Sequence, residues 1–193
     1  EGERIAIMGP SGSGKTTLLN CIGGIDRPDN GEILFEGLSL TSLPEQELCE
    51  LRRNKISTIF QFFHLLPTLT ARENIEFPML LNSVSARERN QKVDELLNAV
   101  KIQHRAGAFP HELSGGEKQR VAIARSLSMQ PKLILADEPT GNLDSKNTDS
   151  VLELIENLSK QHGIAMLLVT HNEEVTSICD QTITMNDGLI LSE

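Results

Sequence analysis

Residues 9–16 constrain the fold of this chain more than any other stretch. They read Gly9, Pro10, Ser11, Gly12, Ser13, Gly14, Lys15 and Thr16, which matches the pattern of a phosphate-binding loop (P-loop) without a mismatch. The apolar run at residues 4–8 predicts a buried strand before the loop, and residues 17–22 predict a helix after it. A strand, a glycine-rich loop and a helix in this order predict an α/β fold with a mostly parallel sheet.

The residues of the loop suit the chemistry of phosphate binding. Glycines allow the tight turn that aims backbone N–H groups inward, and the following helix adds the positive end of its dipole. Lys15 is placed to reach the β- and γ-phosphates, and the Thr16 hydroxyl is placed to ligate Mg²⁺. We therefore expect residues 9–17, with Thr17 as the last, to bind the nucleotide. The alternative interpretation is a Gly/Ser-rich turn with a lysine near a helix start.

Length and charge restrict the remaining possibilities. A chain of 193 residues can form one α/β domain with a small inserted lobe. The net charge is −9 and no block of basic residues occurs, so nucleic acid is not an expected partner. Cys21, Cys49 and Cys179 are few and widely spaced, which favours reduced thiols in a cytosolic protein. No apolar run approaches the ~20 residues of a membrane span, so any action at a membrane would need a partner.

Hydrophobic patterns predict the order of elements along the chain. Strands are expected at residues 32–36, 56–60, 132–137, 165–169, 182–185 and 189–191, the last two forming a hairpin. Helices are expected at residues 45–54 and 145–162, and residues 38–44 are expected to be irregular. The helix at 45–54 has only Leu48 and Leu51 as apolar positions, too few for a core element. Residues 62–130 have helical character, with capping boxes at 85–88 and 114–117.

Candidate catalytic residues follow three of the predicted strands. Asp137 and Glu138 end the strand at 132–137, and parallel sheets place ligands at such carboxyl ends. Asp137 is positioned to hold Mg²⁺ through water, and Glu138 to polarise the attacking water as general base. His171 follows another strand and is a candidate γ-phosphate contact, although a histidine can simply cap a strand. Gln61 follows a third strand and could hold Mg²⁺ or the attacking water, or only cap that strand.

The segment from Ser114 to Glu117 predicts a second anion site. Ordinary helix capping explains Ser114 and Glu117, but two glycines in a first turn, Gly115 and Gly116, cost roughly 1 kcal/mol each relative to alanine. Glycines there expose N–H groups at a helix N-terminus, where anions bind. The segment lies in the helical lobe, away from the P-loop. This arrangement suggests that it contacts a nucleotide held by a partner.

The order of these motifs resembles the ATPase domain of ABC proteins, over nearly the whole chain. The matching segments are residues 9–16, Gln61, residues 113–117, residues 133–138, residues 141–144 and His171. The resemblance implies a RecA-like core at 1–61 and 131–193, with a helical subdomain at about 62–130. It also implies a head-to-tail, ATP-dependent homodimer with two MgATP, each held between one P-loop and the partner's Ser114, Gly115 and Gly116. Asp144 would then lie in the loop that links the two sites.

A finer resemblance points to the subgroup that powers lipoprotein release and macrolide or peptide export. It rests on residues 23–28, 66–74 and 139–144. It implies a transmembrane permease as partner, contacted through residues 61–76, and a location on the cytoplasmic face of the inner membrane. Glu117 stands where many members have glutamine. Members also carry an N-terminal segment with an aromatic residue that stacks on adenine, so we expect that this chain is N-terminally truncated.

Two alternatives from other classes remain. A soluble ABC ATPase of DNA repair or translation would share the same motifs, but chromosome-type members separate the P-loop and the Ser114 segment by long coiled coils, and ribosome-type members carry two domains. A P-loop kinase or GTPase would not need residues 114–116. The guanine-reading pattern is also missing, because Asn54 and Lys55 are followed by Ile56 and Ser57.

Overall fold

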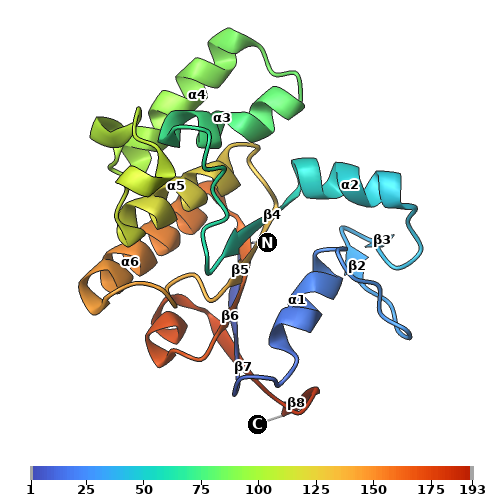
Figure 1. The fold of residues 1–193 in the computed structure, drawn as a ribbon. Helices are drawn as coiled ribbons and strands as arrows, with labels where there is room; N and C mark the ends of the chain where they lie inside the picture. The colour runs from blue at the N-terminus through green and yellow to red at the C-terminus, as the bar shows by residue number, and fades with distance from the viewer. Residues whose placement is uncertain (1, 192–193) are drawn as a thin grey trace.

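A six-stranded sheet forms the centre of the protein. The computed structural model describes residues 2–191, and the strands lie in the order β4-β5-β6-β1-β7-β8 (Figure 1). Their bounds are β1 Arg4–Met8, β4 Ile56–Phe60, β5 Leu133–Asp137, β6 Ala165–Thr170, β7 Gln181–Asn186 and β8 Leu189–Leu191. All neighbours pair in parallel except β7 and β8, which form the predicted antiparallel hairpin. The α/β fold with a mostly parallel sheet is confirmed.

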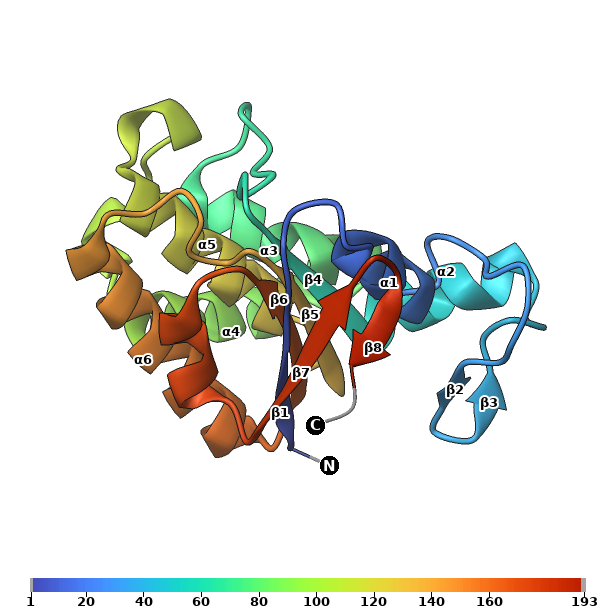
Figure 2. The same cartoon turned by 90° about the horizontal axis from the view of Figure 1, so that it is seen from below.

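Helices cover both faces of this sheet. Helices α1 (Lys15–Ile22) and α2 (Glu45–Asn54) lie on one side, and α3 (Ala71–Leu81), α4 (Ala86–Ala99), α5 (Gly115–Leu127) and α6 (Ser145–His162) lie on the other (Figures 1 and 2). Side chains of β5 alternate between two buried clusters: Ile134 and Ala136 join the one with α3–α6, and Leu135 joins the one with α1 and α2. The central strand β5 therefore contributes apolar surface to both layers, which explains its continuous apolar run in the sequence.

Three expectations for residues 32–54 were wrong. The strand expected at 32–36 is only β2 (Leu34–Phe35), and the stretch expected to be irregular contains β3 (Leu38–Ser39). These two strands form a separate antiparallel hairpin outside the main sheet. Gly37, with φ of 80°, takes the backbone through the turn between them. Helix α2 does reach the core, because Leu48 is buried against the cluster with α1.

The helical subdomain is built from α3, α4, α5 and two short 3₁₀ turns, η1 (Gln103–Arg105) and η2 (Pro110–Glu112). Val93, Leu96 and Leu97 of α4, and Val100 at its C-cap, are buried. Ser114 and Glu117 make the predicted capping box at the start of α5. The boundary of the lobe at about 62–130 stays a prediction. No helix within residues 2–191 combines the length and the apolar character that crossing a membrane requires.

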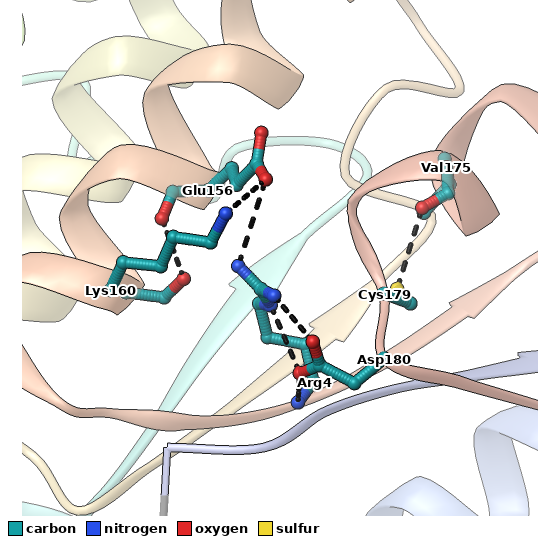
Figure 3. Close-up of polar contacts among 7 residues, drawn as sticks. Arg4, Glu156, Lys160, Val175, Cys179 and Asp180 are labelled. Atoms are coloured by element: carbon teal, nitrogen blue, oxygen red, sulfur yellow. Dashed lines mark hydrogen bonds and ion pairs between the residues drawn. The ribbon is translucent and has the colours of Figure 1, made fainter.

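A polar cluster between α6 and the sheet links the amino ends of β1 and β7. Arg4 is buried, and its Nη2 donates to Asp180 Oδ1 at 2.6 Å while its Nη1 lies 3.9 Å from Glu156 Oε1 of α6 (Figure 3). The guanidinium holds the pKa of Asp180 below its usual range. Burial raises the pKa of the neighbouring Cys179 thiol to about 11. Together these contacts join the amino end of β1 to α6 and to the start of β7.

Candidate active site

The carboxyl ends of four parallel strands meet at one edge of the sheet. Met8 of β1 pairs with Thr170 of β6, and Asp137 of β5 pairs with both Phe60 of β4 and Val169 of β6. The residues that follow these strands therefore emerge side by side. In this way the register places the P-loop, Glu138, His171 and Gln61 at the same edge, as the sequence predicted for parallel strands.

The P-loop takes a conformation that only glycine accepts at its first position. A Cβ on Gly9 would lie 2.0 Å from the Met185 carbonyl oxygen of β7, so no other residue fits there. Gly14 has φ of 96° and forms the N-cap of α1 without a side-chain cap. The turn between β7 and β8 supports the loop, since Gly188 N–H donates to Ser13 O at 3.0 Å. Sequence reasoning missed this support from the last hairpin.

Lys15 lies inside the loop that precedes it. Its Nζ donates to Gly9 O and Pro10 O, both at 2.8 Å, and the side chain is buried. The loop thus gathers an ammonium group and the uncapped N-terminus of α1 at one point. Both features favour an anion. This arrangement fits the phosphate groups of a nucleotide.

Oxygen ligands suited to Mg²⁺ lie directly beside the loop. The Thr16 hydroxyl donates to Asp137 Oδ1 at 3.3 Å, which joins the first helix to the end of β5. Burial raises the pKa of the Asp137 carboxyl, and the nearby Glu138 adds to this rise, while the Thr16 hydroxyl and Lys15 oppose it. Hydroxyl and carboxylate oxygens are the ligands that Mg²⁺ prefers, with the rest of its shell from water and substrate phosphates. In the described residues no group of three His, Cys, Asp or Glu could hold a metal ion.

Glu138 and His171 form a pair that the sequence did not predict. His171 Nδ1 lies 2.6 Å from Glu138 Oε1. Glu138 has φ of 46° and its N–H donates to Val169 O, which turns its side chain toward the end of β6. A cleft of about 640 Å³ opens beside the pair and is lined also by Gly141, Thr148 and Glu173.

Gln61 and Glu138 approach each other over a glycine. A Cβ on Gly141 would lie 2.8 Å from Gln61 Nε2 and 3.0 Å from Glu138 Oε2, so Gly141 leaves room for both side chains. The Asn142 amide donates to Gln61 O at 2.8 Å and holds the end of β4 against this turn. Gln61 is therefore part of the same site as Glu138, which its position in the sequence alone left open.

The Ser114 segment lies away from the P-loop. Gly115 packs against Leu143, and a Cβ on Gly116 would lie 2.6 Å from Asn147 Oδ1. Asp144 caps α6 by accepting from the Asn147 N–H at 2.9 Å, so Asp144 lies in the loop next to this segment. Helices α1 and α5 are on opposite sides of the sheet in both views (Figures 1 and 2). The structure thus brings Ser114, Gly115 and Gly116 to the segment after Glu138 and not to the P-loop of the same chain.

Comparison with known proteins agrees with this arrangement. A family model described as "ABC transporter" matches residues 1–141. The chain belongs to the ABC transporter family. Two solved structures of the cassette MJ0796, one described as a bacterial ABC transporter cassette, are each 41% identical over 100% of this chain and 84% of theirs. Their TM-scores are 0.90, for a dimeric post-hydrolysis state with ADP and phosphate, and 0.91, for a further dimeric structure. The chain is accordingly an ATP-binding, ABC-type ATP hydrolase.

Two polar residues of this ABC ATPase were missed in the sequence. Gln119 is fully buried in α5 and its Nε2 donates at 2.6 Å to the carbonyl of Pro139, which follows Glu138. Arg125, also in α5, donates to the carbonyls of Phe63 and His64 just after Gln61. Both link α5 to the active site. The burial of Gln119 could have been predicted, because Gln119 lies on the same helix face as Ile123. No local pattern in the sequence indicates that Arg125 donates to the carbonyls of Phe63 and His64.

Proposed function

We propose that this ABC ATPase dimerises head to tail around two MgATP and drives a transmembrane permease. The proposal rests first on the 2.6 Å contact between Glu138 and His171 at the sheet edge that carries the P-loop. An acid paired with a histidine beside a phosphate-binding loop suits hydrolysis of a phosphoanhydride.

The residues of the loop would bind and orient ATP. Backbone N–H groups of residues 9–17 and the Lys15 ammonium would hold the phosphates, with Gly9, Gly12 and Gly14 allowing the close approach. Thr16 and Gln61 would ligate Mg²⁺, and Asp137 would hold it through water. When bound, Mg²⁺ supplies positive charge that offsets the charge on the phosphate oxygens.

Glu138 would act as general base. Its carboxylate would accept a proton from water as that water attacks the γ-phosphorus, while the bond to the leaving oxygen of ADP breaks. His171, at 2.6 Å, would fix the carboxylate and contact the γ-phosphate. Gln61, which shares the space over Gly141 with Glu138, would orient the same water.

A partner copy would complete the site. The N-terminus of α5 offers the N–H groups of Gly115 and Gly116 next to the Ser114 side chain, while the Ser114 N–H is bound by Glu117. Helix α5 lies on the opposite side of the sheet from α1. A nucleotide on one P-loop would therefore meet this segment only from a second copy. The solved cassettes similar to this chain are described as dimeric. Asp144, beside the segment, would relay the state of one site to the other.

The surface where the carboxyl ends of α2 and α3 meet, with the loop after Gln61, would contact the permease. A groove of about 380 Å³ lies between them and includes Phe77, Leu81 and Arg125, and Phe62 after Gln61 is 68% exposed. Arg125 ties this loop to α5, so permease motion and the Ser114 segment would be coupled. The protein would then be peripheral on the cytoplasmic face of the inner membrane. Lipoprotein release or macrolide and peptide export is the transport type that the sequence motifs favour.

A Glu138→Gln variant tests the mechanism. We expect turnover to fall about 100-fold or more, since a general base contributes 10²–10⁴, while MgATP binding persists. Sedimentation should show a shift from monomer to dimer only with MgATP. Glu173→Gln is the matched control, because Glu173 lines the same cleft without contacting His171. Retained hydrolysis in Glu138→Gln would remove Glu138 as base, and a persistent monomer would argue against the composite site.

A further inference from the structure

The first turn of α5 carries a carboxylate, Glu117, where the proposed function needs positive potential. Glu117 Oε2 accepts the Ser114 N–H at 2.8 Å, and Ser114 Oγ accepts the Glu117 N–H at 3.3 Å. The acid therefore consumes a backbone donor of the helix N-terminus. Its negative charge also lies beside Gly115 and Gly116.

A carboxylate there opposes the approach of a phosphate. Like charges repel, and the repulsion grows when solvent is excluded between two subunits. The Glu117 side chain is only 26% exposed, so water screens it incompletely. If the N-terminus of α5 receives the terminal phosphate of a nucleotide bound to a second copy, as proposed above, this charge must be balanced.

Arg105 supplies a balancing charge from a different element. It ends η1, and its Nε lies 3.3 Å from Glu117 Oε1, the oxygen that does not accept the Ser114 N–H. Nε is buried and makes no hydrogen bond among the described residues, so its contact with Glu117 is one of charge. The Nη2 group of Arg105 donates to the Glu112 carbonyl, which anchors the guanidinium at this spot. His104 Nε2 lies farther away, at 4.0 Å from the same oxygen.

We propose that Arg105 is a positioning residue that neutralises Glu117 and so keeps the N-terminus of α5 able to receive the nucleotide of a second copy. The inference rests on the proposed composite site and adds a requirement to it. Removal of the arginine leaves an uncompensated carboxylate next to the phosphate. Removal of both charges leaves no carboxylate to repel the phosphate.

A double-mutant cycle tests this role in the Glu138→Gln protein. The measured quantity is the MgATP concentration that gives half-maximal dimer in sedimentation. We expect Arg105→Gln to raise it about two- to fivefold, the range for a charge at a helix N-terminus. For the double variant Arg105→Gln, Glu117→Gln, this MgATP concentration should lie within about twofold of the value for Glu117→Gln alone, because the cycle isolates the charge pair. High salt should reduce the effect of Arg105→Gln.

Arg89→Gln is the matched control in the same lobe. Arg89 also pairs with one carboxylate, Glu76, and donates to one backbone carbonyl, that of Val84. We expect this variant to dimerise like its parent. An Arg105 defect that Glu117→Gln does not rescue, or one that Arg89→Gln reproduces, would overturn the inference and show that Arg105 supports only the fold. If the parent Glu138→Gln protein forms no dimer with MgATP, that result contradicts the proposed composite site itself, independently of Arg105.

Discussion

Helices α1 and α5 both begin with glycine-rich turns, yet their N-termini are built in opposite ways. Gly14 caps α1 in a left-handed conformation, with no side-chain cap and no acid in the first turn. Ser114 caps α5 in a complete capping box with Glu117. The first end leaves its N–H groups for a ligand, whereas the second satisfies part of them with its own side chains.

Under the function proposed above, this contrast corresponds to two kinds of phosphate contact. An open end with a buried lysine, Lys15, suits a ligand that binds first and tightly. A capped end with a balanced acid suits a contact made later, when a second copy arrives with its nucleotide. The predictions below separate what each end contributes to folding and to assembly.

The largest effect is expected for Gly9→Ala at the open end. The new Cβ would lie 2.0 Å from the Met185 carbonyl oxygen, so the loop and β7 must move apart. Urea unfolding should show a loss of at least about 3 kcal/mol. Gly12→Ala is the control, since Gly12 also has positive φ but no atom lies within 4 Å of its Cβ position. Equal losses in the two variants would show that contact with β7 is not what requires glycine at position 9.

Gly115→Ala at the capped end should have the opposite effect on stability. A Cβ there meets Leu143 at an ordinary 3.5 Å, and alanine favours a helix over glycine by up to about 1 kcal/mol. Thermal unfolding should therefore shift upward slightly. In the Glu138→Gln background the same change should weaken ATP-dependent dimerisation, because the methyl group obstructs phosphate at the helix start. Unchanged dimerisation would mean that Gly115 serves no ligand.

Asp137, beside the start of α1, and Glu117, in the first turn of α5, should contribute to stability with opposite signs as pH changes. Burial raises the pKa of Asp137, so its ionised form destabilises the folded state at pH above the folded pKa, and this cost disappears below the unfolded pKa of about 3.9. Asp137→Asn should then be more stable than the parent at neutral pH, with a gain that vanishes in acid. Thermal unfolding between pH 3 and pH 8 measures the gain, and a constant gain across that range would contradict this assignment.

Glu117→Gln should show the smallest effect. The Ser114 N–H and then Arg105 lower the pKa of Glu117, so its ionised form stabilises the fold above the unfolded pKa of about 4.3, and this contribution is lost as pH falls through the folded pKa. The variant should be slightly less stable than the parent at neutral pH and equal to it in acid, because glutamine can keep the capping box. Greater stability than the parent at neutral pH would show that the acid is unbalanced there.

Local chemistry in the sequence was sufficient for much of the fold. The P-loop, the buried strands β1 and β4, the capping box at Ser114 and the end of α6 at Gly163 all depend on residues close together in the chain. Their spacing selects one local conformation, since buried strands, caps and glycine turns each have their own pattern. The hairpin of β2 and β3 was not predicted, because each strand has only two residues. Two residues are too few to show the alternation of apolar and polar positions that marks a strand.

Tertiary structure alone decided which of these residues meet. Strand register pairs Glu138 with His171 and joins Thr16 to Asp137 across 121 residues. The approach of Gln61 to Glu138 over Gly141 and the pairing of Arg105 with Glu117 likewise bring together separate elements. A sequence can place an acid at a strand end or a helix start, and at Glu117 the local Ser114 cap already lowers the pKa. The burial that raises the pKa of Asp137, and partners such as Arg105, depend on how distant elements pack.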